Sequence, residues 1–355
     1  MSTGSWPKSL LVVRLGAMGD VIHTIPAVAA LRNAFATIRI GWIIEQRWAE
    51  LLCAKEAPRS GPRNSARPLT DFVHVVDTKA WRKSLLSSGT RQEIAAALRE
   101  VRKQNYDIAI DFQGALKSAA IGKLAGTKTV VGMKNPREWP ARMFYTKATD
   151  ANGTHIIDQY HSLAEATVGH SLPDCPAAFP QDSRSESEAA KLLASDQQFV
   201  VLNPGAGWGA KQWPAKRYGE VARSLAKDGL TPLINCGPGE EELALAAENA
   251  SESTARRISC SIGELIALIR RARLFIGGDT GPLHLAAALQ VPVVAIFGPT
   301  DPARNGPYGT RSIMLRAPSS LTSLSHTGGP DPGLLSITTD EVIAAARQLL
   351  EAPPA

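Results

Sequence analysis

The fold is decided by the stretch Phe275-Ile276-Gly277-Gly278-Asp279-Thr280-Gly281-Pro282-Leu283-His284. Here an apolar run ends in glycines, and helix-forming sequence follows over residues 281–289. A strand, a turn and a helix in this order are the usual place for an α/β protein to hold an anion, because the amides at the helix start point towards it. A related stretch, Leu11-Val12-Val13-Arg14-Leu15-Gly16-Ala17-Met18-Gly19-Asp20, precedes a helical segment over 21–35. Two such units predict two nucleotide-type folds facing one central cleft.

Strand-like and helical segments alternate along both halves of the chain. In the first half we expect strands at 10–15, 38–44, 72–76, 106–112 and 129–133, and helices at 21–35, 93–103 and 115–124. In the second half we expect strands at 199–203, 231–235, 257–259, 274–277 and 293–297, and helices at 217–228, 240–249, 262–272, 281–289 and 339–350. This alternation predicts α/β architecture: two doubly wound domains in tandem, each with a parallel sheet covered on both faces.

The domain boundaries follow from shifts in composition. We expect an N-terminal domain over 1–170, a proline-rich linker over 171–187 and a C-terminal domain over 188–338. A final helical segment over 339–355 can pack back on the N-terminal domain. Residues 54–70, rich in proline, arginine, serine and glycine, predict a flexible surface loop.

Composition limits the class of protein. The 355 residues carry a net charge of +6, from 39 basic and 33 acidic side chains. We expect no transmembrane helix, no signal peptide in the polar residues 1–9, and a cytoplasmic location. The cysteines (Cys53, Cys175, Cys236 and Cys260) have no metal-binding spacing and are interpreted as reduced core thiols.

Basic residues gather around two tryptophans of the first half. Lys79, Arg82 and Lys83 surround Trp81, and Arg137 and Arg142 flank Trp139. Such clusters suit an anionic membrane surface or a phosphorylated glycolipid. A merely solvated surface remains the alternative. No nucleic-acid-binding motif accompanies them, so no nucleic-acid partner is expected.

A glycine-rich loop follows the first strand of the second half. Its sequence, Gly205-Ala206-Gly207-Trp208-Gly209-Ala210-Lys211, is neither a Walker A loop nor the dinucleotide fingerprint. Its glycines permit close approach of backbone to a ligand, and Lys211 at the rim can neutralise a phosphate. The alternative is a surface loop with a solvated lysine. Glu240 also follows a strand, where a carboxylate can bind ribose or simply favour a helix start.

Two aspartates precede helices, and each has two interpretations. Asp20 is either an N-cap or a general base projecting into the cleft, with His23 one turn further on. Asp279 can cap the helix at Thr280, or serve the anion site together with His284, which shares that helix face. No cluster of histidine, cysteine and carboxylate shows metal spacing, so we expect no metal and a metal-free mechanism.

Several segments together resemble a known family. They are Arg14-Leu15-Gly16-Ala17-Met18-Gly19-Asp20-Val21-Ile22-His23-Thr24-Ile25-Pro26, Asp279-Thr280-Gly281-Pro282-Leu283-His284-Leu285-Ala286-Ala287-Ala288, Phe297-Gly298-Pro299-Thr300-Asp301-Pro302 and the stretch 105–119 that contains Gln113. The chain resembles the ADP-heptose:lipopolysaccharide heptosyltransferases, glycosyltransferase family 9. Trp81-Arg82-Lys83 and Arg137-Glu138 are similar to the type I subfamily, which adds the first heptose.

The resemblance implies the GT-B fold, with two Rossmann-like domains, and an inverting reaction without metal or cofactor. It implies that Asp20 is the base that deprotonates the acceptor hydroxyl of Kdo. The implied donor-binding residues, which hold ADP-heptose, are Gly205, Ala206, Gly207, Lys211, Glu240, Cys260, Asp279, Thr280, Gly281 and His284. The implied acceptor-binding residues, which meet Kdo-lipid A, are Gly19, His23, Lys79, Arg82, Lys83, Gln113 and Arg137.

The expected function is therefore transfer of heptose from ADP-heptose to Kdo-lipid A, by a protein held peripherally at the cytoplasmic face of the inner membrane of a Gram-negative-type bacterium. Three departures from the family bear on the acceptor: no threonines in the donor loop, a longer 54–70 loop, and a shorter region between Met133 and Arg137. The alternatives are a heptosyltransferase with another acceptor and a sugar-nucleotide-binding protein without catalysis. A nicotinamide-dependent oxidoreductase is disfavoured because the dinucleotide fingerprint is absent.

Overall fold

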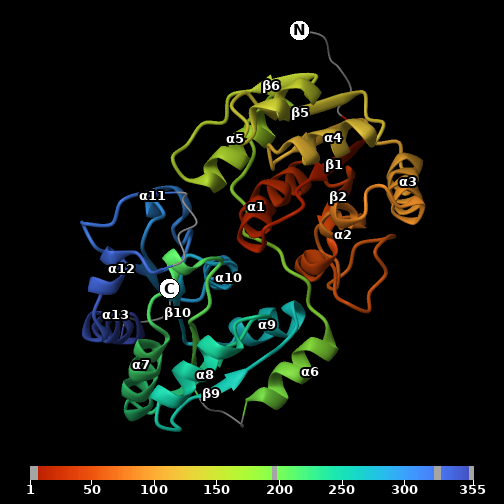
Figure 1. Ribbon diagram of the computed structural model, residues 1–355. Helices are drawn as coiled ribbons and strands as arrows, with labels where there is room; N and C mark the ends of the chain where they lie inside the picture. The colour runs from red at the N-terminus through yellow and green to blue at the C-terminus, as the bar shows by residue number, and fades with distance from the viewer. Residues whose placement is uncertain (1–6, 194–197, 324–328, 352–355) are drawn as a thin grey trace. The chain divides into compact units, whose positions relative to one another are not determined.

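The computed structural model describes residues 7–193, 198–323 and 329–351 and divides the chain into two compact units, Met1–Asp182 and Ser183–Ala355 (Figure 1). The division falls inside the expected linker. Helix α6 (Ser183–Leu192) begins within that linker as well, so the connection is shorter than its composition predicted. The first residues of the chain and residues 352–355 of the expected C-terminal segment lie outside the described residues.

The first unit contains a six-stranded parallel sheet in the order β3-β2-β1-β4-β5-β6. Its strands are β1 (Ser9–Val13), β2 (Arg39–Glu45), β3 (Phe72–Val76), β4 (Ile108–Asp111), β5 (Thr129–Met133) and β6 (Lys147–Thr149). All five residues of β1 are buried, as expected for a central strand covered on both faces. The short edge strand β6 has no buried residue, and this is why no apolar run predicted it.

Helices and short 3₁₀ segments flank this sheet. They are α1 (Met18–Ala34), η1 (Gln46–Leu51), α2 (Thr78–Lys83), α3 (Ser88–Lys103), α4 (Leu116–Leu124), η2 (Trp139–Phe144) and α5 (Ile156–Val168). Helix α1 packs against α5. Helix α1 starts three residues before the expected Val21, so Asp20 lies inside its first turn.

The second unit repeats the same topology. Its sheet has the order β12-β11-β10-β7-β8-β9, again entirely parallel. The strands are β7 (Phe199–Asn203), β8 (Thr231–Asn235), β9 (Arg256–Ile258), β10 (Leu274–Gly278), β11 (Val293–Phe297) and β12 (Ser312–Arg316). Counted from the first strand of its own unit, each sheet has the order 3-2-1-4-5-6, which is that of the Rossmann fold.

Helices flank the second sheet too. Besides α6, they are η3 (Gly209–Lys211), α7 (Ala215–Lys227), α8 (Glu241–Ala250), α9 (Ile262–Ile269), α10 (Gly281–Ala288), α11 (Pro302–Asn305), α12 (Pro332–Ser336) and α13 (Thr339–Glu351). The last of these, α13, was expected to be able to pack back on the N-terminal domain. Its buried residues Val342, Ala346 and Leu349 instead belong to the apolar core of the second unit, where the helix contacts α7 and β10–β12.

The 54–70 segment is more constrained than its composition predicted. The side chain of Arg67 is buried and donates to the backbone carbonyls of Pro58, Gly61, Pro62 and Thr70. One guanidinium thus satisfies four carbonyls that the irregular backbone leaves without partners. The segment is a loop without regular strands, but hydrogen bonds to Arg67 hold its backbone in place.

Over the part of the chain that the structure describes, no helix combines the length and the apolar composition needed to cross a bilayer.

Candidate active site

The strand order of each sheet reverses at one point, between β1 and β4 in the first unit and between β7 and β10 in the second. In open α/β sheets, ligands bind outside the carboxyl ends of the strands at such switch points. The residues that follow β1 and β4 include Asp20 and Gln113. Those that follow β7 and β10 include Lys211 and Asp279. Each unit therefore has its own candidate site, and the predicted residues lie at both.

Asp20 occupies the third position of α1, whereas Ala17 is the N-cap. The interpretation of Asp20 as the N-cap is therefore wrong, but its carboxylate still caps the helix from within. Its Oδ2 accepts a hydrogen bond from the Ala17 amide at 3.1 Å. The side chain is 35% exposed, and no contact within the described residues occupies its other oxygen, Oδ1. A carboxylate held in this way stays accessible to a proton donor.

Arg14 fixes the orientation of Asp20. Its Nη2 lies 2.7 Å from Asp20 Oδ2, and its Nη1 donates to the Phe112 carbonyl at 2.8 Å. The guanidinium is buried and lies over the ring of Tyr160. Burial lowers the pKa of Arg14, but the nearby Tyr160, Asp20 and Asp111 raise it by more. Sequence reasoning assigned Arg14 no role, although a charged residue directly after the apolar β1 was a usable signal.

Gln113 follows the neighbouring strand β4, and Arg137 follows the next strand, β5. Gln113 Oε1 accepts from the amide of Leu15, which ties the two strand ends together. Asp111 is fully buried and accepts hydrogen bonds from the Gln113 and Gly114 amides, Ser118 and Tyr145. The backbone of Arg137 touches Gly114, so its exposed side chain starts beside this loop.

The remaining acceptor-site candidates lie in three settings. Lys79, Arg82 and Lys83 are exposed on α2, which follows the edge strand β3. Gly19 is half-buried in the first turn of α1. His23 is buried, and its ring packs edge-on against His155 at 5.8 Å between centroids. The structure therefore groups Asp20, Gly19 and Gln113 at the switch point. His23 lies one turn further along α1, where that helix packs against α5.

The second switch point is built around Asp279. Its Oδ2 forms a short ion pair with Lys211 Nζ, and its Oδ1 lies 2.9 Å from His284 Nε2. The side chains of Lys211 and Asp279 are only 11% and 8% exposed, so Lys211 is not a rim residue. Thr280, rather than Asp279, is the N-cap of α10, so the capping interpretation of Asp279 is wrong.

The charges of this cluster determine its ionisation. Burial would raise the pKa of Asp279, but His284 and Lys211 lower it by more, so the pKa lies well below its usual range. The carboxylate thus stays ionised at all physiological pH values. Lys211 Nζ also lies 4.1 Å from the centre of the Trp208 ring, a cation–π contact that sequence reasoning did not identify.

The glycine loop meets Glu240 at the neighbouring strand ends. A Cβ at Gly205 would lie 2.0 Å from Glu240 Cδ, so only glycine lets this carboxylate approach. Asn203 supports the contact by donating to the Gly205 carbonyl at 3.0 Å. Burial raises the pKa of Glu240, and the Gly237 amide donates to its Oε2. The loop and Glu240, predicted separately, are therefore one site.

The other donor-site candidates line the same edge of the sheet. Thr280 and Gly281 form the start of α10, whose first amides have no partners within the helix. Ala206 and Gly207 lie in the loop, and Gly207 has open space around it. Cys260 follows β9, and burial raises the pKa of its thiol to about 12. All four cysteines are free. Cys53 is buried and the other three are half-buried, so the prediction of core thiols holds in full for Cys53 alone.

No metal-binding cluster accompanies these sites. Among the described residues, no group of three or more histidine, cysteine or carboxylate side chains could hold a metal ion. Positive charge at the second switch point comes from Lys211, which is paired with Asp279, and from the partial charges of the amides at the start of α10.

Comparisons with known proteins identify the family of this chain. Residues 94–326 match the family model described as glycosyltransferase family 9 (heptosyltransferase). Lipopolysaccharide heptosyltransferase 1 of Pseudomonas aeruginosa is 30% identical over 317 residues, which cover 86% of this chain and 83% of the relative. Its counterpart in Escherichia coli K12 is 28% identical over 313 residues, covering 87% and 93%.

The solved structures point the same way. The E. coli heptosyltransferase WaaC with ADP-2-deoxy-2-fluoro heptose matches with a TM-score of 0.75 at 26% identity, covering 96% of this chain and 99% of that one. A glycosyl transferase family 9 protein from Veillonella parvula shares the fold, with a TM-score of 0.81. The two Rossmann-type units and the match to the WaaC structure show the GT-B fold, which confirms the predicted fold class. The chain belongs to glycosyltransferase family 9 and is a heptosyltransferase.

Proposed function

We propose that this protein transfers heptose from ADP-heptose to the Kdo of Kdo-lipid A, in assembly of the lipopolysaccharide inner core. The observation that carries the proposal is the carboxylate of Asp20, exposed to solvent on one side and held by the buried Arg14 on the other. A base in this setting can take a proton from an acceptor hydroxyl without losing its orientation. The names of the relatives support lipopolysaccharide as the acceptor class.

The chemistry is a single displacement. Asp20 removes the proton of the acceptor hydroxyl, whose oxygen forms a bond to the anomeric carbon of heptose. The bond from that carbon to the diphosphate breaks, and ADP leaves with the electron pair, so the configuration inverts. Lys211 and the amides of Thr280 and Gly281 stabilise the charge that develops on the departing diphosphate.

Further donor contacts are assigned to the same edge of the second sheet. Asp279 accepts from heptose hydroxyls, Glu240 binds the ribose, and the backbone around Cys260 flanks the adenine. His284 keeps Asp279 in position through the contact at 2.9 Å. Gly205, Ala206 and Gly207 bring backbone amides to the phosphates. The glycines of the loop support this assignment, because they let the backbone approach a ligand closely.

The acceptor contacts are assigned to the first unit. Lys79, Arg82, Lys83 and Arg137 are exposed cations that suit the acidic groups of Kdo and lipid A. Gly19 and Gln113 lie beside Asp20, and His23 supports the helix that carries it. The same cations would hold the protein peripherally at the cytoplasmic face of the inner membrane.

One experiment tests the acceptor directly. The protein is incubated with ADP-heptose and either Kdo-lipid A or the same lipid already carrying one heptose, and the products are weighed by mass spectrometry. Addition of one heptose to Kdo-lipid A alone is expected. Transfer only to the heptosylated lipid would contradict the proposal and assign a later step. Excess EDTA should leave the rate unchanged, because Lys211 and helix amides supply the positive charge.

A further inference from the structure

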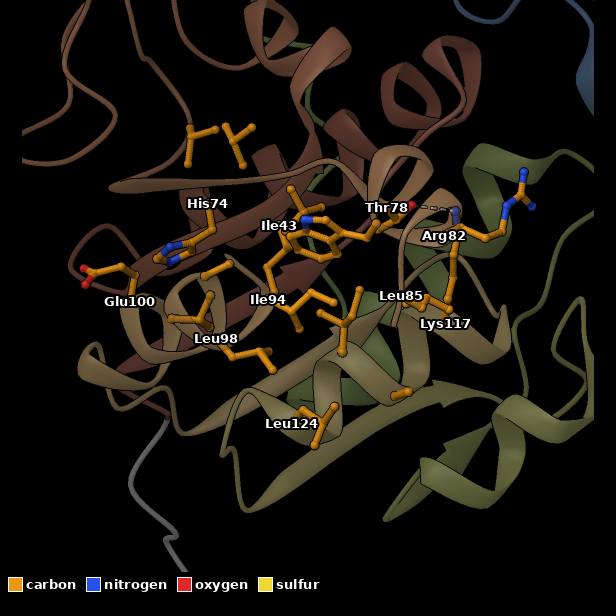
Figure 2. Close-up of a pocket in the computed structure, with 18 of the residues that line it drawn as sticks. Ile43, His74, Thr78, Arg82, Leu85, Ile94, Leu98, Glu100, Lys117 and Leu124 are labelled. Atoms are coloured by element: carbon orange, nitrogen blue, oxygen red, sulfur yellow. Dashed lines mark hydrogen bonds between the residues drawn. The ribbon is translucent and has the colours of Figure 1, made fainter. Parts of the chain in front are cut away.

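The first unit contains an apolar pocket of about 540 Å³ (Figure 2), and neither Asp20 nor Gln113 is among the residues that line it. It lies between the edge strand β3 and helices α2, α3 and α4, and aliphatic side chains make up most of its wall. A volume of this size is in the range of pockets that bind small molecules. None of the residues assigned to transfer lies in it except Arg82.

The packing of α3 explains why the pocket is apolar. Ile94, Ala97, Leu98 and Val101 recur at helical spacing and face the pocket, yet Val101 alone among the described residues of α3 is buried. An amphipathic helix of this length normally buries such a stripe against its sheet. Here the stripe lines a space open to solvent near Leu85, which is 55% exposed.

The two ends of the pocket differ in charge. Figure 2 shows Arg82, Thr78 and Lys117 at one end, where Lys117 Nζ donates to Thr78 Oγ1 at 3.2 Å. Glu45 Oε1 lies 4.0 Å from Lys117 Nζ, so the Glu45 carboxylate balances part of the positive charge of Lys117. Arg82 forms no ion pair with any of the residues that the structure describes. The positive charge at this end is therefore available to a ligand.

At the opposite end, the titratable side chains that Figure 2 labels carry little net charge, and a further lining cation, Arg59, donates to Gln46 Oε1 at 3.4 Å. His74 and Glu100 lie there in Figure 2. His74 Nε2 lies 2.8 Å from the Tyr106 hydroxyl, and burial lowers the pKa of His74 to about 4, so the ring is uncharged near neutral pH. Glu100 is paired with Lys103 at 2.6 Å. A pocket for a polar metabolite needs several polar groups that converge on the ligand. The wall of this pocket is mostly aliphatic, so it suits an apolar ligand better.

We propose that this pocket binds one hydrocarbon chain of an acidic lipid, with the acidic group at the Arg82–Lys117 end. The aliphatic wall matches the chain, and the cationic end matches the headgroup. The inference goes beyond heptosyl transfer, because it holds whichever acceptor the enzyme uses, and its readout is binding rather than turnover.

Trp81 lines the pocket and provides a local reporter. Bromine atoms on an alkyl chain quench tryptophan fluorescence on close approach, so dibromostearate should quench the wild-type protein in a saturable way. Trp81→Phe should remove most of that quenching, although six of the seven tryptophans remain. Equal quenching in the Trp81→Phe protein would place the chain elsewhere and overturn the proposal.

A matched pair of substitutions on α3 tests occupancy of the space. Ala97 lines the pocket, whereas Ala95 is exposed on the same helix and does not. Ala97→Phe should weaken dibromostearate binding about tenfold or more, as expected when the burial of two methylenes is lost. Ala95→Phe should bind like the wild type. Equal affinities of the two variants would overturn the proposal, as would tighter binding by Ala97→Phe.

The headgroup is tested by a ligand pair. Dibromostearate should bind more tightly than its uncharged glyceryl ester, and Arg82→Gln should reduce that preference about fivefold. An unchanged preference in Arg82→Gln would refute the placement of the acidic group. Circular dichroism of each variant checks folding, and the Trp81→Phe comparison decides the location even if Ala97→Phe fails to fold.

Discussion

Each sheet has a cation and a carboxylate at its switch point, but the two pairs differ in exposure. In the first unit Arg14 is buried and the Asp20 side chain is 35% exposed. In the second unit the side chains of Lys211 and Asp279 are only 11% and 8% exposed, and His284 is a second partner of Asp279. One topology thus holds a carboxylate in two ways. The exposed one is available to exchange a proton, and the enclosed one is fixed as a charged acceptor.

The most severe test of this difference is Asp20→Asn. The amide keeps an oxygen for the Ala17 hydrogen bond but cannot act as a base, so the rate should fall about 10²–10⁴-fold while ADP affinity stays unchanged. Transfer assays and calorimetric titration with ADP measure the two effects. Asp158→Asn, in the first turn of α5, is the matched control and should remain active. Normal turnover by a folded Asp20→Asn protein would show that Asp20 is not the base, and the functional difference proposed between Asp20 and Asp279 would be wrong.

Lys211→Met tests the enclosed pair. It removes the cation nearest the proposed diphosphate site, so the transfer rate should fall about 10²–10³-fold and ADP-heptose should bind less tightly. Single-turnover kinetics separate the two effects. Lys216→Met, an exposed lysine of α7, should change neither. If Lys211→Met changed the stability of the protein but neither the transfer rate nor ADP-heptose binding, the Lys211–Asp279 pair would stabilise the fold without taking part in transfer.

The pH dependence of stability tests the enclosed Lys211–Asp279 pair as well. Because the folded pKa of Asp279 is depressed, its stabilisation is present above the unfolded pKa of about 3.9 and is lost only as the pH falls through the lower folded value. Asp279→Asn should therefore lower the free energy of unfolding by about 3 kcal/mol near neutral pH, and the difference should persist at about pH 5. Urea unfolding of both proteins across this range measures it. A difference that vanished near pH 5 would contradict the depressed pKa.

The smallest expected effect is on the exposed cations of the first unit. Arg82→Gln with Lys83→Gln should raise the acceptor KM about twofold to fivefold per residue at low salt and leave ADP affinity unchanged. Added salt should weaken the wild type in the same way, because exposed charges are screened. Lys216→Gln with Lys227→Gln removes equal charge from the second unit and serves as control. If both double variants raised the acceptor KM equally, the effect would come from the net charge of the protein and not from an acceptor contact on α2.

The sequence predicted the central strands well because they are buried on both faces. Residues 129–133, 199–203, 231–235 and 293–297 were predicted with the observed bounds, and so was the half-buried edge strand β3 at 72–76, whose residues are mostly apolar. The edge strands β6 and β12 were missed because they are short or only half-buried. Helix α6 was missed because its many serines and glutamates resemble linker composition.

The candidate sites were predicted as residues but not as contacts. Motifs identified Asp20, Lys211 and Asp279 one at a time. The pairing of Lys211 with Asp279 joins positions 68 residues apart, and it depends on β7 and β10 being neighbours in the sheet. Likewise, the contact between Gly205 and Glu240 depends on the ends of β7 and β8. Such pairs follow from strand order, which no local pattern encodes.

The strand order has a further consequence during synthesis. No strand is shared between the sheets, and the last strand of the first sheet ends at Thr149, well before β7 begins at Phe199. The central strand β1 can pair with β2 early, because Val12 pairs with Trp42, but its other edge must wait for β4, because Leu10 pairs with Ile108. A nascent chain therefore keeps one edge of this buried strand unpaired until about a third of the protein has been made. It can then complete the whole first sheet on the ribosome before the second unit has been made.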